Sequence, residues 1–121
     1  MNRIIRKIFD NKIIEAGKKL HPIFGFMDLC NHDSTLLNHY NDGEYYAPHR
    51  DVAVLTAITF FIDDVGFSGG EFEFADYDCR VEQKNNRTVI FPSAARHSVA
   101  PVKVPKNGKG RYSMAQFIMM R

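Results

Sequence analysis

Short β-type segments separated by polar turns follow one another from residue 34 onward, and no helical pattern interrupts them. The expected strands are 34–40, 44–49, 54–62, 71–74, 79–83, 87–91, 96–102 and 111–119. Turn residues lie between them, for example Asn41-Asp42-Gly43, the stretch from Gly66 to Gly70, and Lys106-Asn107-Gly108. This pattern indicates an all-β sandwich or barrel, and the number of strands suits a double-stranded β-helix, or jelly roll.

The segment before the strands predicts one amphipathic helix that packs on a sheet. Residues 3–20 alternate apolar and charged residues at roughly helical spacing. The apolar positions are Ile4, Ile5, Ile8, Ile13 and Leu20. Residues 21–33 contain Pro22 and Gly25 and are expected to form a loop. The chain of 121 residues is therefore expected to be one domain, with helical support over about 1–33 and a jelly-roll core over about 34–121.

Composition limits the partners and the compartment. The net charge is only +2 and the basic residues are mostly spread out, so neither a nucleic-acid nor a membrane partner is expected. The first residues lack the apolar region of a signal peptide, and no apolar run reaches the length of a membrane span, which predicts a soluble cytoplasmic protein. Cys30 and Cys79 have no metal-finger or CxxC spacing and are expected to be reduced thiols. The oligomeric state stays open.

The stretch from Tyr40 to Asp51 ends in His49-x-Asp51. On an extended backbone, residues two apart point to the same side, so this imidazole and this carboxylate form a pair of metal ligands. His97 is the candidate third ligand, because it follows a tight turn around Pro92 at the start of a later strand. Two histidines and one carboxylate on one face of a metal are typical of non-haem Fe(II) oxygenases.

The last strand contributes a candidate anion site. Arg111 and Ser113 lie on one side of an otherwise apolar strand. A guanidinium inside an apolar barrel needs an anion, and an arginine beside a hydroxyl suits capture of a carboxylate. The alternative, an Arg111 exposed to solvent at the beginning of the strand, stays open at this point.

Six motifs in order resemble the 2-oxoglutarate- and Fe(II)-dependent oxygenase superfamily, most of all its prolyl-4-hydroxylase-type branch. They are Tyr40-x-x-Gly43, Tyr46-x-x-His49-x-Asp51, Gly69-Gly70-Glu71-Phe72, Ile90-Phe91-Pro92-Ser93, His97-x-Val99-x-Pro101-Val102 and Arg111-x-Ser113. The resemblance as a whole covers residues 38–117. The collagen-type members that this chain resembles usually carry Lys where Arg111 stands, which argues against a narrow collagen-type assignment.

The resemblance implies a role for each matching residue. His49, Asp51 and His97 would ligate Fe(II). Arg111 and Ser113 would bind the distal carboxylate of 2-oxoglutarate, and Tyr40 and Thr59 would be further residues that contact this co-substrate. Tyr46 would line the approach of the substrate to the metal. The implied reaction is hydroxylation of an unactivated C–H bond with O2, which releases succinate and CO2, with ascorbate as a reductant. The implied substrate is a peptide, a protein or a small molecule, and a prolyl residue is the family-level expectation.

Other functions are compatible with the same pattern. One is a non-enzymatic, cupin-like metal-binding or sensor module, which has no need for Arg111 inside the barrel. Another is a different reaction of the same superfamily, namely nucleic-acid demethylation or hydroxylation of a free amino acid. A purely structural jelly roll would make the ordered set of ligands a coincidence.

Overall fold

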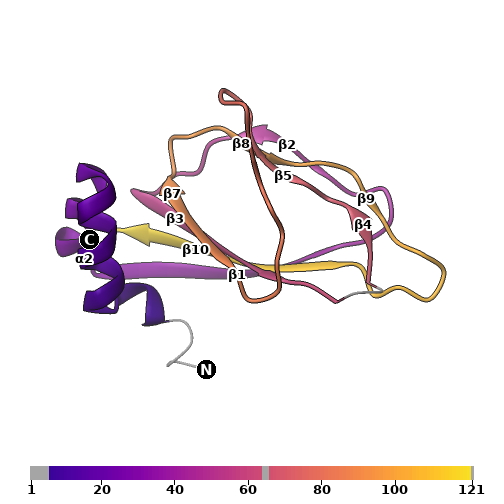
Figure 1. The fold of residues 1–121 in the computed structure, drawn as a ribbon, viewed down its shortest axis with the longest axis horizontal. Coiled ribbons are helices and arrows are strands. Elements are labelled where there is room, and N and C mark those ends of the chain that lie inside the picture. The colour runs from indigo at the N-terminus through magenta and orange to yellow at the C-terminus, as the bar shows by residue number, and fades with distance from the viewer. Residues whose placement is uncertain (1–5, 64–65, 121) are drawn as a thin grey trace.

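Two four-stranded antiparallel sheets form the body of the protein in the computed structural model, which describes residues 6–63 and 66–120 (Figure 1). The helical elements are η1 (Arg6–Phe9), α2 (Asn11–Leu20) and η2 (Pro22–Leu29). The strands are β1 (His32–Tyr40), β2 (Tyr46–His49), β3 (Leu55–Phe61), β4 (Ser68–Gly69), β5 (Phe72–Phe74), β6 (Cys79–Val81), β7 (Thr88–Pro92), β8 (His97–Val99), β9 (Val102–Lys103) and β10 (Arg111–Met119).

The order of the strands confirms the expected jelly roll. The first sheet has the order β1-β10-β3-β7, the second has the order β2-β8-β5-β6, and β4 pairs with β9 separately. All described pairings are antiparallel. Strands distant in sequence thus lie side by side, as β1 does with β10 and β2 does with β8. Figure 1 shows β2, β5 and β8 on one side and β1, β3, β7 and β10 on the other, with the helices beside the end of β10.

Seven of the eight expected strands correspond to one observed strand each, and the largest difference concerns residues 96–102. That segment forms two strands, β8 and β9, with a break at Ala100-Pro101. Pro101 lacks a backbone N–H and cannot donate to a ladder, so a strand is interrupted there. Residues 68 and 69, expected as part of a turn, form the short strand β4 against β9.

The expected N-terminal amphipathic helix is present, but it is divided into two elements, and residues 3–5 lie outside the described part. A 3₁₀ turn, η1, ends at Phe9, and α2 begins after Asp10. Asp10 has an extended backbone and its side chain accepts a hydrogen bond from the backbone N–H of Lys12 at 2.8 Å. An N-cap of this kind starts a new helix.

The expectation of a loop over residues 21–33 is wrong for residues 22–29, which form the 3₁₀ helix η2. Pro22 occupies the first turn, where its missing N–H costs nothing, and the side chain of His21 accepts a hydrogen bond from Ile23 N at 3.2 Å. Gly17 lets η2 approach α2 closely, since a Cβ at this position would lie 2.6 Å from Cδ1 of Phe24.

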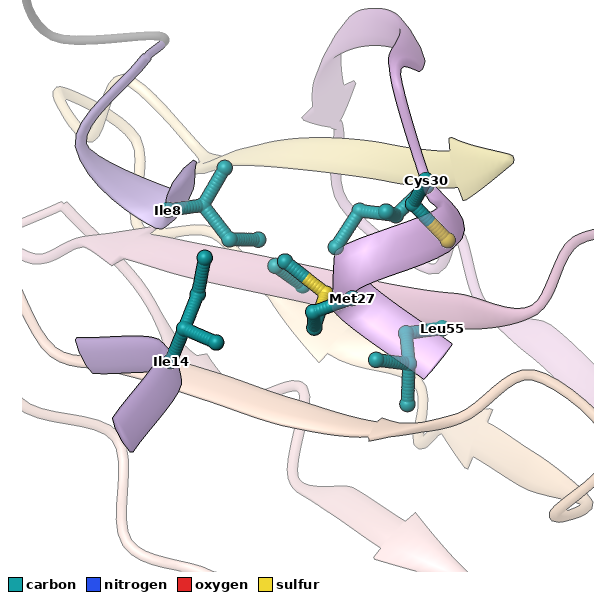
Figure 2. Packing of buried hydrophobic residues seen from close by; sticks show 7 residues of the cluster. Ile8, Ile14, Met27, Cys30 and Leu55 are labelled. Atoms are coloured by element: carbon teal, nitrogen blue, oxygen red, sulfur yellow. The ribbon is translucent and has the colours of Figure 1, made fainter. Parts of the chain in front are cut away.

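One apolar cluster joins the helices to the outer face of the first sheet, as the helix-on-sheet expectation requires. Ile8, Ile14, Met27 and Cys30 from the N-terminal segment converge on Leu55 of β3 (Figure 2). Ala57 and Ile118 complete the buried set. The other face of the first sheet packs against the second sheet through Phe60, Phe72, Phe91 and Val99. β3 is therefore covered on both faces, which explains its nearly continuous apolar sequence.

Cys30 is buried and Cys79 is exposed, and both are free thiols. None of the helices in the described ranges has the length and apolar character that crossing a bilayer requires.

Candidate active site

His49, Asp51 and His97 converge at one end of the space between the two sheets. His49 is the last residue of β2 and is paired in register with His97, the first residue of β8. Their ring centroids lie 4.3 Å apart. Asp51 lies two residues beyond the end of β2, and one ligand atom from each of the three residues lies within 4.8 Å of the others. Two histidines and one carboxylate are the donor set that a facial metal site requires.

Both imidazoles are oriented by the backbone. Nδ1 of His49 lies 2.8 Å from the carbonyl oxygen of Ala47, and Nδ1 of His97 lies 2.8 Å from that of Ala95. A carbonyl can only accept, so each Nδ1 carries the hydrogen. Each Nε2 faces the carboxylate of Asp51, at 3.5 Å for His49 and 3.2 Å for His97. Metal-binding histidines are commonly held in this way.

The electrostatics of His97 favour a cation at this point. The side chain is 2% exposed, and burial lowers the pKa of His97 below its usual value, although Asp51 and the bond to Ala95 act in the opposite direction. A neutral ring with its hydrogen on Nδ1 directs the lone pair of Nε2 at a carboxylate oxygen. Two electron-rich groups in contact are stabilised when a cation lies between them.

Two buried hydroxyls position the carboxylate. Thr56 donates to Oδ2 of Asp51 at 2.9 Å and lies 2.8 Å from the hydroxyl oxygen of Ser93. The backbone N–H of Asp51 donates to the carbonyl of Ser93 at 3.0 Å. Thr56 and Ser93 are fully buried. The aspartate is thus held by its main chain and by its side chain.

A cavity of about 100 Å³ extends from this cluster to Arg111. Its lining includes all three candidate ligands, Arg111 and Ser113. The guanidinium is 1% exposed, and its Nη2 has no hydrogen-bond partner. None of the ion pairs found within the described ranges involves Arg111. Burial lowers the pKa of Arg111 below its usual value, which is the mark of a charge without compensation.

The side chain of Arg111 is fixed along its length. Nε donates to Oε1 of Gln83 at 2.9 Å, and Nη1 lies 3.5 Å from the hydroxyl of Ser113. The stem runs past Gly70, where a Cβ would lie only 2.8 Å from Cδ of Arg111. The open alternative of a solvent-exposed Arg111 is therefore excluded.

The two tyrosines occupy different parts of the cavity. Arg111 Cζ lies 5.2 Å from the ring centroid of Tyr40, and burial raises the pKa of this phenol above its usual value. Tyr46 is half exposed, and its ring lies against His49 with centroids 3.8 Å apart. Tyr40 therefore borders the guanidinium, whereas Tyr46 lies at the entrance beside a candidate ligand.

Thr59 does not join this group, contrary to the expectation that it is a co-substrate residue. Its hydroxyl is paired with that of Thr88 at 2.7 Å, and it lines a space on the helix side of the first sheet. Thr56 and Thr59 are three residues apart on one strand, so they point to opposite faces. The inward hydroxyl of β3 is that of Thr56.

Comparison with known proteins gives the family. Residues 35–119 match the sequence model of the 2OG-Fe(II) oxygenase superfamily, which is well over half of the chain. The chain belongs to the 2OG-Fe(II) oxygenase superfamily. Among curated proteins, none matches the chain significantly.

Solved structures share the fold. A prolyl-4-hydroxylase from Pseudomonas putida is 21% identical with a TM-score of 0.66, and the match covers 92% of this chain and 62% of that one. A viral collagen prolyl hydroxylase from Paramecium Bursaria Chlorella virus-1 is 18% identical with a TM-score of 0.56, and the match covers 93% of this chain and 75% of that one. A 2OG-Fe(II) family oxidoreductase from Burkholderia pseudomallei is 14% identical with a TM-score of 0.62, and the match covers 98% of this chain and 57% of that one. This chain spans less than two thirds of the first and third of these proteins.

The residues present fit the metal and the co-substrate that the superfamily uses. The donor set is two imidazoles and one carboxylate, and the uncompensated guanidinium lies in the same cavity. Sequence reasoning assigned no role to Thr56, Ser93 or Gln83. Ser93 ends the Ile90-Phe91-Pro92-Ser93 motif, and Thr56 is one of two threonines in an apolar strand whose sequence does not show which of them faces the cavity. No local pattern distinguishes Gln83.

Proposed function

We propose that this oxygenase is an Fe(II)- and 2-oxoglutarate-dependent hydroxylase that acts on an unactivated C–H bond. The observation that carries the proposal is the buried Nη2 of Arg111, which has no partner and lies in the same cavity as the candidate metal ligands. A buried guanidinium of this kind needs an anion. A dicarboxylate that reaches from the metal to Arg111 satisfies both groups with one molecule.

In this proposal His49, Asp51 and His97 would hold Fe(II), each through one ligand atom. The carbonyls of Ala47 and Ala95 keep each Nε2 directed at the metal position. Bound Fe(II) supplies the redox chemistry that couples conversion of 2-oxoglutarate and O2 to succinate and CO2 with hydroxylation of the substrate.

Arg111 and Ser113 bind the distal carboxylate of 2-oxoglutarate. The guanidinium offers two donors on one edge, and the Ser113 hydroxyl adds a third. Tyr40 borders this group, and its raised pKa keeps the phenol protonated and able to donate a hydrogen bond. Phe72 lines the cavity, and Phe60 and Phe91 pack against its ring, so this side of the site is apolar.

The substrate reaches the metal past Tyr46, whose exposed ring lies over His49. A peptide with a prolyl residue is the first substrate to test, because two of the structurally similar proteins are prolyl hydroxylases. Succinate and CO2 formed in proportion to hydroxylated peptide, with ascorbate as reductant, would identify the reaction.

The deciding experiment is an anaerobic titration of the apoprotein with Fe(II) and then 2-oxoglutarate, followed by the visible charge-transfer band of the chelate. The wild-type protein is expected to form the band. His97→Ala is expected to lose Fe(II) binding, and Arg111→Ala is expected to keep Fe(II) but weaken 2-oxoglutarate.

Two results would contradict the proposal. Fe(II) binding without a band would favour a metal-binding or sensor module. Unchanged Fe(II) affinity in His97→Ala would show that the third ligand is wrong.

A further inference from the structure

We propose that Gln83 is the positioning residue for Arg111, and that its neutral amide keeps the guanidinium free for the carboxylate of the ligand. This inference rests on the proposed function, because it concerns the same 2-oxoglutarate site. Gln83 belongs to the loop between β6 and β7, which connects the second sheet to the first at the Arg111 end of the cavity.

The first step concerns the edge of Arg111 that the ligand meets. Gln83 Oε1 accepts the hydrogen of Nε at 2.9 Å, so the edge formed by Nε and Nη2 is already in use. Nη1 has only a long contact of 3.5 Å to Ser113, and Nη2 has no partner. The edge formed by Nη1 and Nη2 is therefore the one that remains for two parallel hydrogen bonds to a carboxylate.

The second step concerns the orientation of the amide. Nε2 of Gln83 lies 3.4 Å from the carbonyl oxygen of Gly69, and Oε1 faces Arg111. A flipped amide would place its NH2 against the N–H of Arg111 and its oxygen against the carbonyl of Gly69. Both contacts would be repulsive, so the neighbours select one orientation. Gln83 thus connects the β6–β7 loop, the Gly69 turn and the guanidinium.

The third step concerns charge. A glutamate at position 83 would have the same shape and would still accept from Nε. It would also form an ion pair with Arg111 and supply the negative charge that the guanidinium lacks. The ligand's carboxylate would then compete with a built-in one. The amide holds the arginine in place without this competition, which makes the identity of residue 83 a determinant of co-substrate affinity.

The test compares Gln83→Glu and Gln83→Ala with Asn85→Asp as the matched control. Asn85 lies in the same loop, and its Oδ1 accepts from the backbone N–H of Ile62, not from Arg111. Asn85→Asp therefore introduces the same amide-to-carboxylate change away from the guanidinium. The dissociation constants of Fe(II) and of 2-oxoglutarate are measured separately by anaerobic titration of each protein.

Gln83→Glu is expected to weaken 2-oxoglutarate about tenfold or more, since one lost charge-assisted interaction has at least this size. Gln83→Ala is expected to lower the affinity for 2-oxoglutarate by a smaller factor. It is also expected to reduce the preference for 2-oxoglutarate over the longer 2-oxoadipate, because the guanidinium is no longer held in one position. Asn85→Asp and all Fe(II) affinities are expected to stay unchanged. A change in chain-length preference is not produced by general destabilisation.

Two outcomes overturn the inference separately from the proposed function. If the wild-type protein binds 2-oxoglutarate through Arg111 and Gln83→Glu binds it equally well, the role of Gln83 is wrong and the function stands. If Asn85→Asp loses as much affinity as Gln83→Glu, the effect belongs to the loop and not to the contact. If the wild-type protein does not bind 2-oxoglutarate, the proposed function fails and the inference fails with it.

Discussion

The hydroxyl of Thr56 donates a hydrogen bond of 2.9 Å to Oδ2 of Asp51. This bond crosses from β3, an inner strand of the first sheet, to the segment that follows β2 of the second sheet. Oδ2 is thereby occupied, and Oδ1 remains the carboxylate oxygen without this constraint. Removing a group that orients a metal ligand in this way typically lowers metal affinity or activity by about 10–100-fold.

Thr56→Val is expected to weaken Fe(II) binding about tenfold, because valine keeps the shape of threonine but cannot donate to Asp51. Thr59→Val is the matched control, since it makes the same change on the opposite face of the same strand, where the hydroxyl is paired with Thr88. Anaerobic Fe(II) titration of both variants measures the effect. Equal Fe(II) affinity in Thr56→Val and wild-type protein would rule out the role of this hydrogen bond.

The contrast between Thr56 and Thr59 also shows where sequence reasoning stops. Strand alternation correctly places Arg111 and Ser113 on one face, because the other residues of that strand are mostly apolar and only one face can hold a charge. β3 is buried on both faces, so its sequence carries no alternation that marks the inner side. Which threonine faces the cavity depends on the packing of the helices, and that packing is not visible in the strand.

The grouping of the three candidate metal ligands can be predicted from the sequence for a different reason. His49 and Asp51 are close in sequence, and the turn before His97 has a local signature. The jelly-roll topology then brings β2 and β8 together. Gln83 has no such signature, because a glutamine in a polar loop looks like any exposed residue. Its contact with Arg111 exists only through the path of the β6–β7 loop.

Arg111→Met is expected to raise the free energy of unfolding of the apoprotein by about 1 kcal/mol or more, since it replaces a buried, uncompensated charge by an apolar chain of similar length. The lowered pKa of Arg111 indicates that the charged side chain destabilises the folded protein, so its removal should raise the free energy of unfolding. When the folded-state pKa is below the unfolded value, the protonated form is destabilised by folding, and this cost applies at every pH below the folded-state pKa, including neutral pH.

Urea unfolding of the apoproteins at neutral pH checks this expectation. Arg96→Met is the control, because Arg96 is partly exposed and paired with Asp76, and its loss should leave stability unchanged or slightly lower. In the presence of Mn(II), added 2-oxoglutarate should further stabilise the wild-type protein and not Arg111→Met. A clear loss of apoprotein stability in Arg111→Met would mean that the guanidinium is compensated.

Gly70→Ala is expected to destabilise the protein by about 1–3 kcal/mol and also to weaken 2-oxoglutarate binding. The backbone of Gly70 has a φ of 66°, where a Cβ is strained, and the new Cβ would press on Cδ of Arg111. Gly43→Ala separates the two effects. Gly43 has a φ of 81°, but a Cβ there would meet no atom within 4 Å.

Both variants are therefore expected to show a loss in urea unfolding, and only Gly70→Ala is expected to lose 2-oxoglutarate affinity in an anaerobic titration of the Fe(II)-loaded protein. The reason is that only residue 70 lies against the stem of Arg111 and can displace its guanidinium. Equal 2-oxoglutarate affinities in the two variants would show that the position of the stem does not control the anion site.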